Sequence, residues 1–108
     1  MNIEKLRNIL ESIQRFTNKV AYRAFPVGEA PQLPFICYQE TGTDNFYADG
    51  VVLKYSSIVD IELYSKNRDT VSERLIEEKL EENGIAWTKD IEYLDDEKCY
   101  EVIYTVEV

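Results

Sequence analysis

The sequence predicts an α+β fold, with two helices packed on one face of a mainly antiparallel sheet. Residues 51–65 and 99–108 alternate apolar with polar side chains, which is typical of half-buried strands. Residues 2–17 and 69–83 instead repeat apolar side chains every three or four positions, which is typical of amphipathic helices. With shorter strand-like segments between them, the expected order is α-β-β-β-α-β-β. The length of 108 residues suits a single domain covering residues 1–108.

The first predicted helix, residues 2–17, begins at Asn2, a suitable N-cap, and ends near Thr17. Its apolar stripe is expected to pack on the core and consists of Ile3, Leu6, Ile9, Leu10, Ile13 and Phe16. Two short strands are expected next, at residues 20–25 and 35–40. The three prolines between them remove backbone donors and favour extended geometry, so this segment is expected to be an ordered loop or sheet edge.

The alternating segment 51–65 is unusually long for a strand. Its apolar positions are Val51, Leu53, Tyr55, Val59, Ile61 and Leu63. Fully extended, the segment would span roughly 50 Å. A compact domain of this size is only roughly 35 Å across. We therefore expect the strand either to bend at Ser56 and Ser57 or to project from the body, and we predict that its first half contacts a partner.

The segment before this strand, residues 41–50, is longer than a usual hairpin loop. Asp49 and Gly50 favour a turn with positive φ. Phe46 and Tyr47 either anchor a partner or fold back over the sheet, and both interpretations remain open. The predicted partner or oligomer contacts in this region are Asp44, Asn45, Phe46, Tyr47, Asp49, Leu53 and Tyr55. The acidic positions do not have calcium-loop spacing, so no cation site is expected.

The second predicted helix has well-defined ends. Thr70 and Glu73 have capping-box spacing, and Asp69 adds negative charge at the positive end of the helix dipole. Gly84 favours a left-handed stop after Asn83. The expected apolar stripe is Val71, Leu75, Ile76 and Leu80. The expected solvated acidic surface is Glu73, Glu77, Glu78, Glu81 and Glu82.

The chain is expected to end in a β-hairpin. Residues 86–94 and 99–108 are strand-like, and the polar residues between them suit a tight turn. Residues 99–108 alternate except at Cys99 and Ile103, which predicts one face in the core and one in solvent.

Charge is unevenly distributed along the chain, whose net charge is −9. Residues 1–25 carry five basic and two acidic side chains, whereas the remainder carries 7 basic and 19 acidic ones. An acidic body repels phosphate, so tight DNA wrapping is disfavoured. The opposite charges either attract neighbouring copies of the chain or serve only solubility, and both interpretations remain open.

No enzymatic constellation is recognisable, so we expect a non-enzymatic protein without a cofactor. The chain has no histidine, no nucleophile elbow and no phosphate-binding glycine loop. Cys37 and Cys99 lack zinc-site spacing and are expected to be buried, reduced thiols. No apolar run is long enough to span a membrane, and the start does not resemble a signal peptide. We therefore expect the cytoplasm, or a particle assembled there.

The ordered segments resemble small tail-completion proteins of long-tailed bacteriophages and prophages, the tail terminator or head–tail joining class. The resemblance covers nearly the whole chain and rests on segments rather than on a catalytic signature. Its segments are AFPVGEAPQLPFICYQE, DNFYADG, IVDIELYSKNRDTVSERLIEEKLEENGI and EKCYEVIYTVEV.

The resemblance implies an α+β protein that caps the tail tube as a hexameric ring. Its partners would be further copies of itself, the tail tube protein and the head–tail connector, with DNA passing transiently through the lumen. It would reside in the virion tail after assembly in the host bacterial cytoplasm. In this context we expect Glu73, Glu77 and Glu81 to face the lumen and repel DNA.

Two other interpretations remain open. The first is a related joining or minor protein that stays monomeric until it docks. The second is an acidic binding module or inhibitor that docks on a basic partner through its charged helix.

Overall fold

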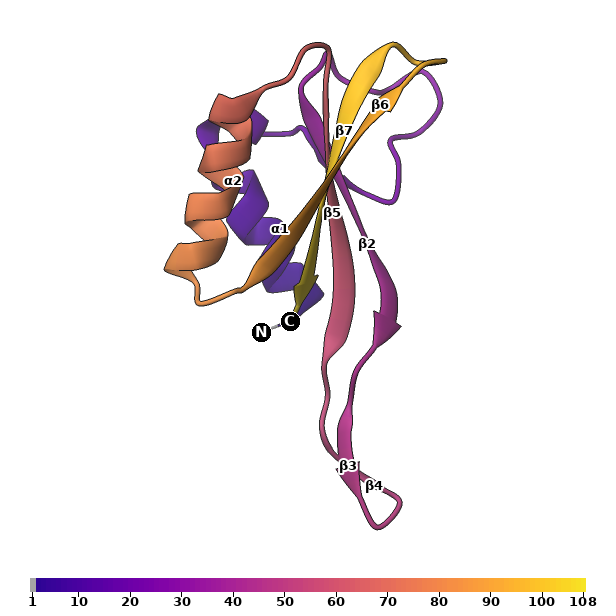
Figure 1. The fold of residues 1–108 in the computed structure, drawn as a ribbon, viewed down its shortest axis with the longest axis vertical. Helices are drawn as coiled ribbons and strands as arrows, with labels where there is room; N and C mark the ends of the chain where they lie inside the picture. The colour runs from indigo at the N-terminus through magenta and orange to yellow at the C-terminus, as the bar shows by residue number, and fades with distance from the viewer. Residues whose placement is uncertain (1) are drawn as a thin grey trace.

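The computed structural model describes residues 2–108 and confirms the expected α+β class (Figure 1). Two helices lie on one face of a five-stranded sheet of order β1-β2-β5-β7-β6, and a separate two-stranded sheet of β3 and β4 extends from one end. β1 pairs with β2 in parallel, and the remaining neighbours are antiparallel. The elements are α1 (Ile3–Glu11), the 3-10 turn η1 (Gln14–Phe16), β1 (Val20–Tyr22), β2 (Phe35–Thr43), β3 (Phe46–Ala48), β4 (Val51–Lys54), β5 (Ser57–Ser65), α2 (Thr70–Glu82), β6 (Trp87–Leu94) and β7 (Cys99–Glu107).

The first helix begins where predicted but ends earlier. Asn2 is the N-cap, and its Oδ1 accepts a hydrogen bond from the Lys5 amide at 2.9 Å. The helix stops at Glu11 because Ile13 adopts an extended backbone, with φ −71° and ψ 115°. The turn η1 that follows still delivers Phe16 to the core, where the side chain is fully buried.

The second helix has the predicted ends but a different N-cap. The Asp69 carboxylate accepts hydrogen bonds from the amide of Ser72 at 3.0 Å and from its hydroxyl at 2.7 Å. The predicted capping box of Thr70 and Glu73 is therefore wrong, because Asp69 already occupies the capping position. At the other end, Gly84 has a φ of +68°, as the left-handed stop requires.

The core lies between the helices and one face of the sheet. It consists of Leu6, Leu10, Ile13 and Phe16 from the N-terminal segment, Ile76, Leu80 and Ile85 from the α2 region, and Val20, Ile36, Tyr38, Val59, Ile61, Leu63, Val102, Tyr104 and Val106 from the sheet. The predicted apolar stripe of α2 is wrong at Val71, which is 58% exposed. Cys37 and Cys99 are buried free thiols, and burial raises the pKa of Cys37 to about 11. Neither helix in residues 2–108 is long and apolar enough to cross a membrane.

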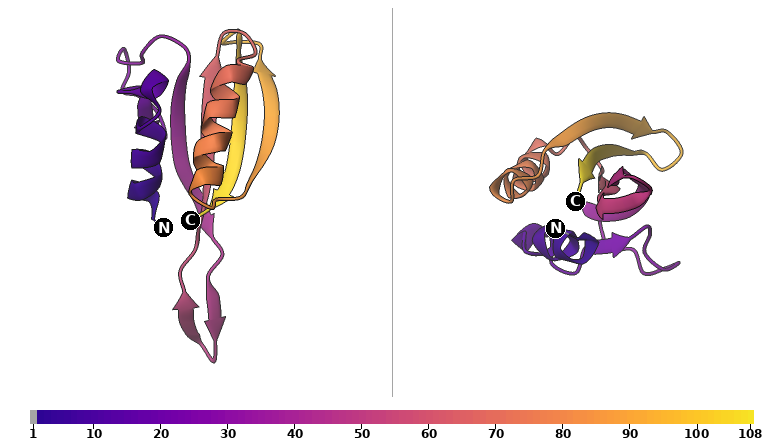
Figure 2. Two further views of the ribbon diagram at one scale, coloured as in Figure 1. Left: turned by 90° about the vertical axis from the view of Figure 1, so that its left-hand side faces the viewer. Right: turned by 90° about the horizontal axis from the view of Figure 1, so that it is seen from below.

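The long alternating segment is divided into two strands that belong to different sheets. Tyr55 and Ser56 interrupt it, and β5 enters the centre of the main sheet while β4 projects beyond the body (Figures 1 and 2). The projection comprises residues 44–55, which we call the arm. The arm lengthens the molecule, whose dimensions along its principal axes are 49 × 28 × 23 Å. Both expectations for this segment are thus met in part, since it is interrupted close to Ser56 and its first half projects.

Candidate functional site

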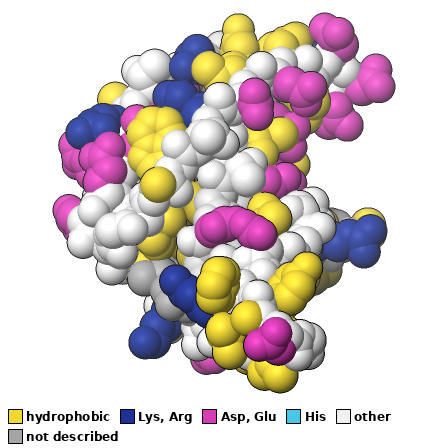
Figure 3. Space-filling view, turned by 60° about the horizontal axis from the view of Figure 1, so that its bottom comes forward, with side chains coloured by type: hydrophobic (Ala, Val, Ile, Leu, Met, Phe, Trp, Pro, Cys, Tyr) yellow, Lys and Arg dark blue, Asp and Glu magenta, His cyan; other side chains and the backbone are white. Residues whose placement is uncertain are grey.

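The arm exposes an apolar surface that no part of its own body covers. Among residues 2–108, twelve large hydrophobic side chains are more than one-third exposed, and half of them lie in the arm. The six are Phe46, Tyr47, Val51, Val52, Leu53 and Tyr55. Hydrophobic side chains gather over this end of the molecule in Figure 3. Exposed apolar clusters of this kind mark interaction sites in soluble proteins.

The two predicted roles of the aromatic pair can now be separated. Phe46 and Tyr47 are 64% and 67% exposed and lie in β3, outside the main sheet. The interpretation that they fold back to cover the sheet is therefore wrong. The predicted turn is confirmed, since Asp49 and Gly50 have φ values of 52° and 76°.

Polar groups hold the base of the arm. The Asn45 Oδ1 accepts a hydrogen bond from the Ser56 amide at 2.9 Å, and the Asp44 amide donates to the Ser56 carbonyl at 3.0 Å. Asp44 also lies beside Glu107, and a hydrogen bond between the two carboxyl groups raises the pKa of Glu107. Of the predicted contact residues, Asn45 thus positions the arm, while Phe46, Tyr47, Leu53 and Tyr55 form its exposed surface and Asp49 its tip.

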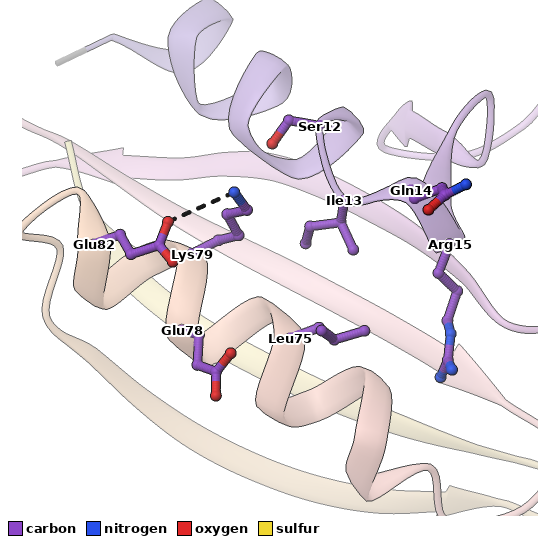
Figure 4. Close-up of a pocket in the computed structure, with 8 residues that line it drawn as sticks. All are labelled: Ser12, Ile13, Gln14, Arg15, Leu75, Glu78, Lys79 and Glu82. Carbon is purple, nitrogen blue, oxygen red and sulfur yellow. Dashed lines mark ion pairs between the residues drawn. The ribbon is translucent and has the colours of Figure 1, made fainter.

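A groove lies between the N-terminal segment and α2 (Figure 4). Its volume is about 520 Å³, within the ~300–1,000 Å³ range of common binding sites. Ile13 and Leu75 contribute apolar side chains from its two walls. The other lining side chains are polar or charged: Ser12, Gln14, Arg15, Glu78, Lys79 and Glu82. The prediction that Ile13 belongs to the core is confirmed, and Leu75 is partly buried against it. The sequence did not predict a groove, because the gap depends on how far apart the two helices pack.

The predicted acidic surface of α2 is wrong for two of its glutamates. Glu73 is 2% exposed and Glu77 is 7% exposed, so neither faces solvent or a lumen. Glu73 binds Arg68 at 2.6 Å and Lys89 at 3.1 Å. Lys89 also binds Glu77 at 2.9 Å. Only Glu81, of the three predicted lumen residues, stays exposed.

Glu73 and Glu77 are buried because β6 supplies a partner beneath α2. Its register places Lys89 opposite Tyr104 on the core side of the sheet. The Tyr104 hydroxyl donates to Glu77 at 2.7 Å. Burial opposes ionisation of Glu73, but the hydrogen bonds and charges of Arg68 and Lys89 outweigh it, and the pKa of Glu73 lies below its usual value. The hydrogen bond to Glu77 raises the pKa of Lys89 despite burial. These contacts fasten α2 to the sheet edge.

A different acidic surface covers the sheet face that points away from the helices. The strand register brings six carboxylates to this acidic sheet face: Asp60, Glu62, Asp90, Glu92, Glu101 and Glu107. The register puts no lysine or arginine on this face of the described strands β2, β5, β6 and β7. In the sequence, these carboxylates are visible only as polar positions of separate alternating strands. The pairing of the strands shows that they share one surface.

On the acidic sheet face, the Tyr64 hydroxyl lies within hydrogen-bonding distance of two carboxylates. The Tyr64 hydroxyl lies 2.7 Å from a Glu101 oxygen and 3.0 Å from a Glu62 oxygen. A single hydroxyl proton cannot serve two ionised carboxylates at once. Burial raises the pKa of Glu62, the Tyr64 hydrogen bond lowers it, and the charge of Glu101 raises it again, with a net upward shift.

Among residues 2–108, no three or more acidic or cysteine side chains are arranged to hold a metal ion. A scan of the sequence against protein-family models and a search of curated protein sequences find no match.

Proposed function

We propose that this protein is a non-enzymatic structural protein of a bacteriophage tail. It completes the tail tube as a ring of identical subunits, six by resemblance, and offers the surface on which head and tail join. It would be assembled in the cytoplasm of a host bacterium and reside in the virion tail. Its partners would be its own copies, the tail tube protein and the head–tail connector.

The observation that carries the proposal is the projecting apolar arm. A two-stranded hairpin alone is marginally stable in water, and this one has no core of its own. An arm with six exposed large hydrophobic side chains suits a protein that becomes complete only in an assembly.

The acidic sheet face supports the proposal in a second way. A ring around passing DNA needs a wall that does not bind phosphate, and a surface of carboxylates repels it. We therefore propose the acidic sheet face as the lumen surface, in place of Glu73 and Glu77.

The test is to measure the mass of the purified protein in solution and to image it with tail tubes by electron microscopy. We expect rings, or tube ends capped by the protein. The double substitution Phe46→Ser and Tyr47→Ser should leave the body folded and abolish assembly. Val27→Ser is the matched control, because Val27 is exposed but lies outside the arm. Wild-type protein that neither oligomerises nor binds tubes would refute the proposal.

The acidic sheet face also favours a second candidate, an acidic module that docks on a basic partner. This candidate predicts binding that needs the carboxylates rather than the arm. Replacing Asp90 and Glu92 by Asn and Gln should then abolish capture by a basic protein, whereas the Phe46→Ser and Tyr47→Ser variant should bind normally. The opposite pattern would favour the tail protein.

A further inference from the structure

We propose that neighbouring copies of this chain join side by side, with the acidic edge of one copy against the basic edge of the next. The acidic edge consists of β6 and its two flanking segments, residues 86–98. The basic edge consists of β1 and the residues at its two ends, residues 19–23. The inference rests on the self-assembly part of the proposed function and names the two surfaces that meet.

The two edges lie on opposite sides of the molecule. β1 and β6 are the outermost strands of the main sheet, and the view along the long axis places β1 beside α1 and β6 beside α2 (Figure 2). Open edge strands are sites to which another chain can add. Because the two edges are different surfaces, they meet head to tail, and such a contact closes into a ring when successive copies are related by rotation.

The strand directions suit this arrangement. β1 is parallel to β2, and three antiparallel pairings lead from β2 through β5 and β7 to β6, so β6 runs antiparallel to β1. In a ring whose axis follows the strands, β6 of one copy therefore runs antiparallel to β1 of the next, which is the more stable pairing. The arm extends along the same axis, so all arms project from one side of the ring (Figure 1).

The edges carry opposite charges that are unpaired within the chain. Residues 1–25 have a net charge of +3, and residues 86–98, with two basic and five acidic side chains, have a net charge of −3. Among residues 2–108, Lys19 and Arg23 at the ends of β1 have no salt-bridge partner. The same holds for all five exposed carboxylates of the acidic edge: Asp90, Glu92, Asp95, Asp96 and Glu97.

The register of the sheet brings these charges to the same height. Following the paired residues from strand to strand, Val20 lies in one row with Ile91, and Lys19 lies in one row with Glu92. Val20 is buried in the core, so alternation places Lys19 on the side of the acidic sheet face, as it does Glu92. A neighbour shifted by two residues would bring Lys19 to Asp90 instead, which is again a carboxylate.

Exposed apolar side chains lie on the helix side of the same two edges. Tyr22 is 49% exposed at the basic edge, and Ile91 and Tyr93 are 43% and 49% exposed at the acidic edge. Alternation puts Tyr22 on the side of Val20, and Ile91 and Tyr93 on the side of Lys89, which binds Glu77 beneath α2. The joined edges would therefore cover apolar side chains on one side and pair charges on the other.

Charge reversal tests the inference. The first variant carries Lys19→Glu and Arg23→Glu, the second carries Asp90→Lys and Glu92→Lys, and the swapped variant carries all four substitutions. Lys66→Glu is the matched control, because Lys66 is exposed after the central strand β5 and has no salt-bridge partner among residues 2–108. Circular dichroism checks that each variant is folded, and analytical ultracentrifugation compares its mass with the 12.6 kDa chain.

Each double variant should associate about tenfold more weakly than wild type, or worse, because like charges then face each other. The swapped variant should assemble again, since its edges are once more opposite in charge, and so should an equal mixture of the two double variants. The control should assemble as wild type does. Charged edges set the orientation of partners more than their affinity, so the arm is still needed in all of these chains. Should a double variant fail to fold, the milder pair Lys19→Gln and Arg23→Gln should also weaken association.

Three results would overturn the inference. They are wild-type assembly by either folded double variant, a folded swapped variant that stays monomeric, and a wild-type chain that stays monomeric at millimolar concentration. In the last case, capping of tail tubes by that monomer would leave the proposed function intact. Conversely, loss and recovery of assembly as expected, in a protein that ignores tail tubes, would support the edge contact and refute the proposed function.

Discussion

Glutamates of the same helix have opposite roles in this protein. Glu73 and Glu77 lie beneath α2, bound by Arg68, Lys89 and Tyr104, whereas Glu81 is exposed on the same helix. Their spacing along the helix does not distinguish a solvated carboxylate from one that meets a lysine on a neighbouring strand. The carboxylates that we propose for the lumen surface therefore lie elsewhere, on the sheet.

Removing the charge of Glu73 should weaken the fold. Glu73→Gln leaves Arg68 and Lys89 without their shared partner, and hydrogen bonds to charged groups contribute about 1.5–3 kcal/mol each. Because both cations are partly exposed, we expect a loss of about 2 kcal/mol in the free energy of unfolding. Denaturant titration measures it, with Glu81→Gln as an exposed control expected within about 0.5 kcal/mol of wild type. Equal stability of the two variants would show that the buried contacts contribute little.

Glu62 should make stability depend on pH in the opposite direction from Glu73. The pKa of Glu62 is raised in the folded state, so its contribution is complete below its unfolded pKa and is lost as pH rises through the folded value. Glu62→Gln should therefore match wild type at pH values below about 4 and become the more stable protein as pH rises toward 7. Denaturant titrations across this range test it, and Asp90→Asn, an exposed change on the same face, is the control. A stability difference that does not vary with pH would contradict the assignment.

At the scale of elements, the start of α2 depends on Asp69. Its carboxylate caps the helix through Ser72 and lies 3.5 Å from Arg15. Asp69→Ala should cost about 1 kcal/mol of folding free energy, the usual cost of losing an N-cap. Thermal or chemical denaturation measures this loss. Thr70→Ala should leave the folding free energy nearly unchanged. A larger loss for Thr70→Ala than for Asp69→Ala would show that Thr70, and not Asp69, caps the helix.

The arm should be the least protected strand pair of the isolated chain. β3 and β4 are three and four residues long, every residue in them is exposed, and they lie away from both helices (Figure 1). Amide hydrogens exchange rapidly where few buried contacts hold a hairpin together. In the monomer, the arm amides should exchange orders of magnitude faster than those of β5. Assembly should slow exchange in the arm, and slow exchange in a dilute monomer would contradict this.

At the scale of the whole molecule, body and arm are separable. The Cα radius of gyration is 14.8 Å, above the ~13 Å expected for a compact chain of this length, because the arm extends from one end. The core contains no arm residue. The core and the surface that we propose for assembly therefore lie in different parts of the chain.

Replacing residues 45–55 by Asn-Gly tests this separation. The shortened chain should keep the free energy of unfolding within about 1 kcal/mol, because no buried core contact is removed. Its radius of gyration, measured by small-angle scattering, should fall below that of the full chain, and assembly should be lost. An unfolded product would mean that the arm stabilises the body.

The sequence by itself determined α2, the start of α1, the central strands of the main sheet and the turn at Asp49 and Gly50, but not the early end of α1 or the strand β3. It did so because periodicity, caps and positive-φ residues are local properties. It also indicated that the segment 51–65 was too long for the body. The tertiary structure alone decided which sheet each half of this segment joined.

The tertiary structure also decided which carboxylates share a surface. Glu73 lost its expected exposure because β6 brings Lys89 beneath α2, and the acidic sheet face formed because strand register aligns residues that are distant in the chain. The groove likewise depends on the separation of two helices. Such contacts join residues on separate helices and strands, 16 positions apart for Glu73 and Lys89, so their energies are set by pairing and packing, which local patterns do not encode.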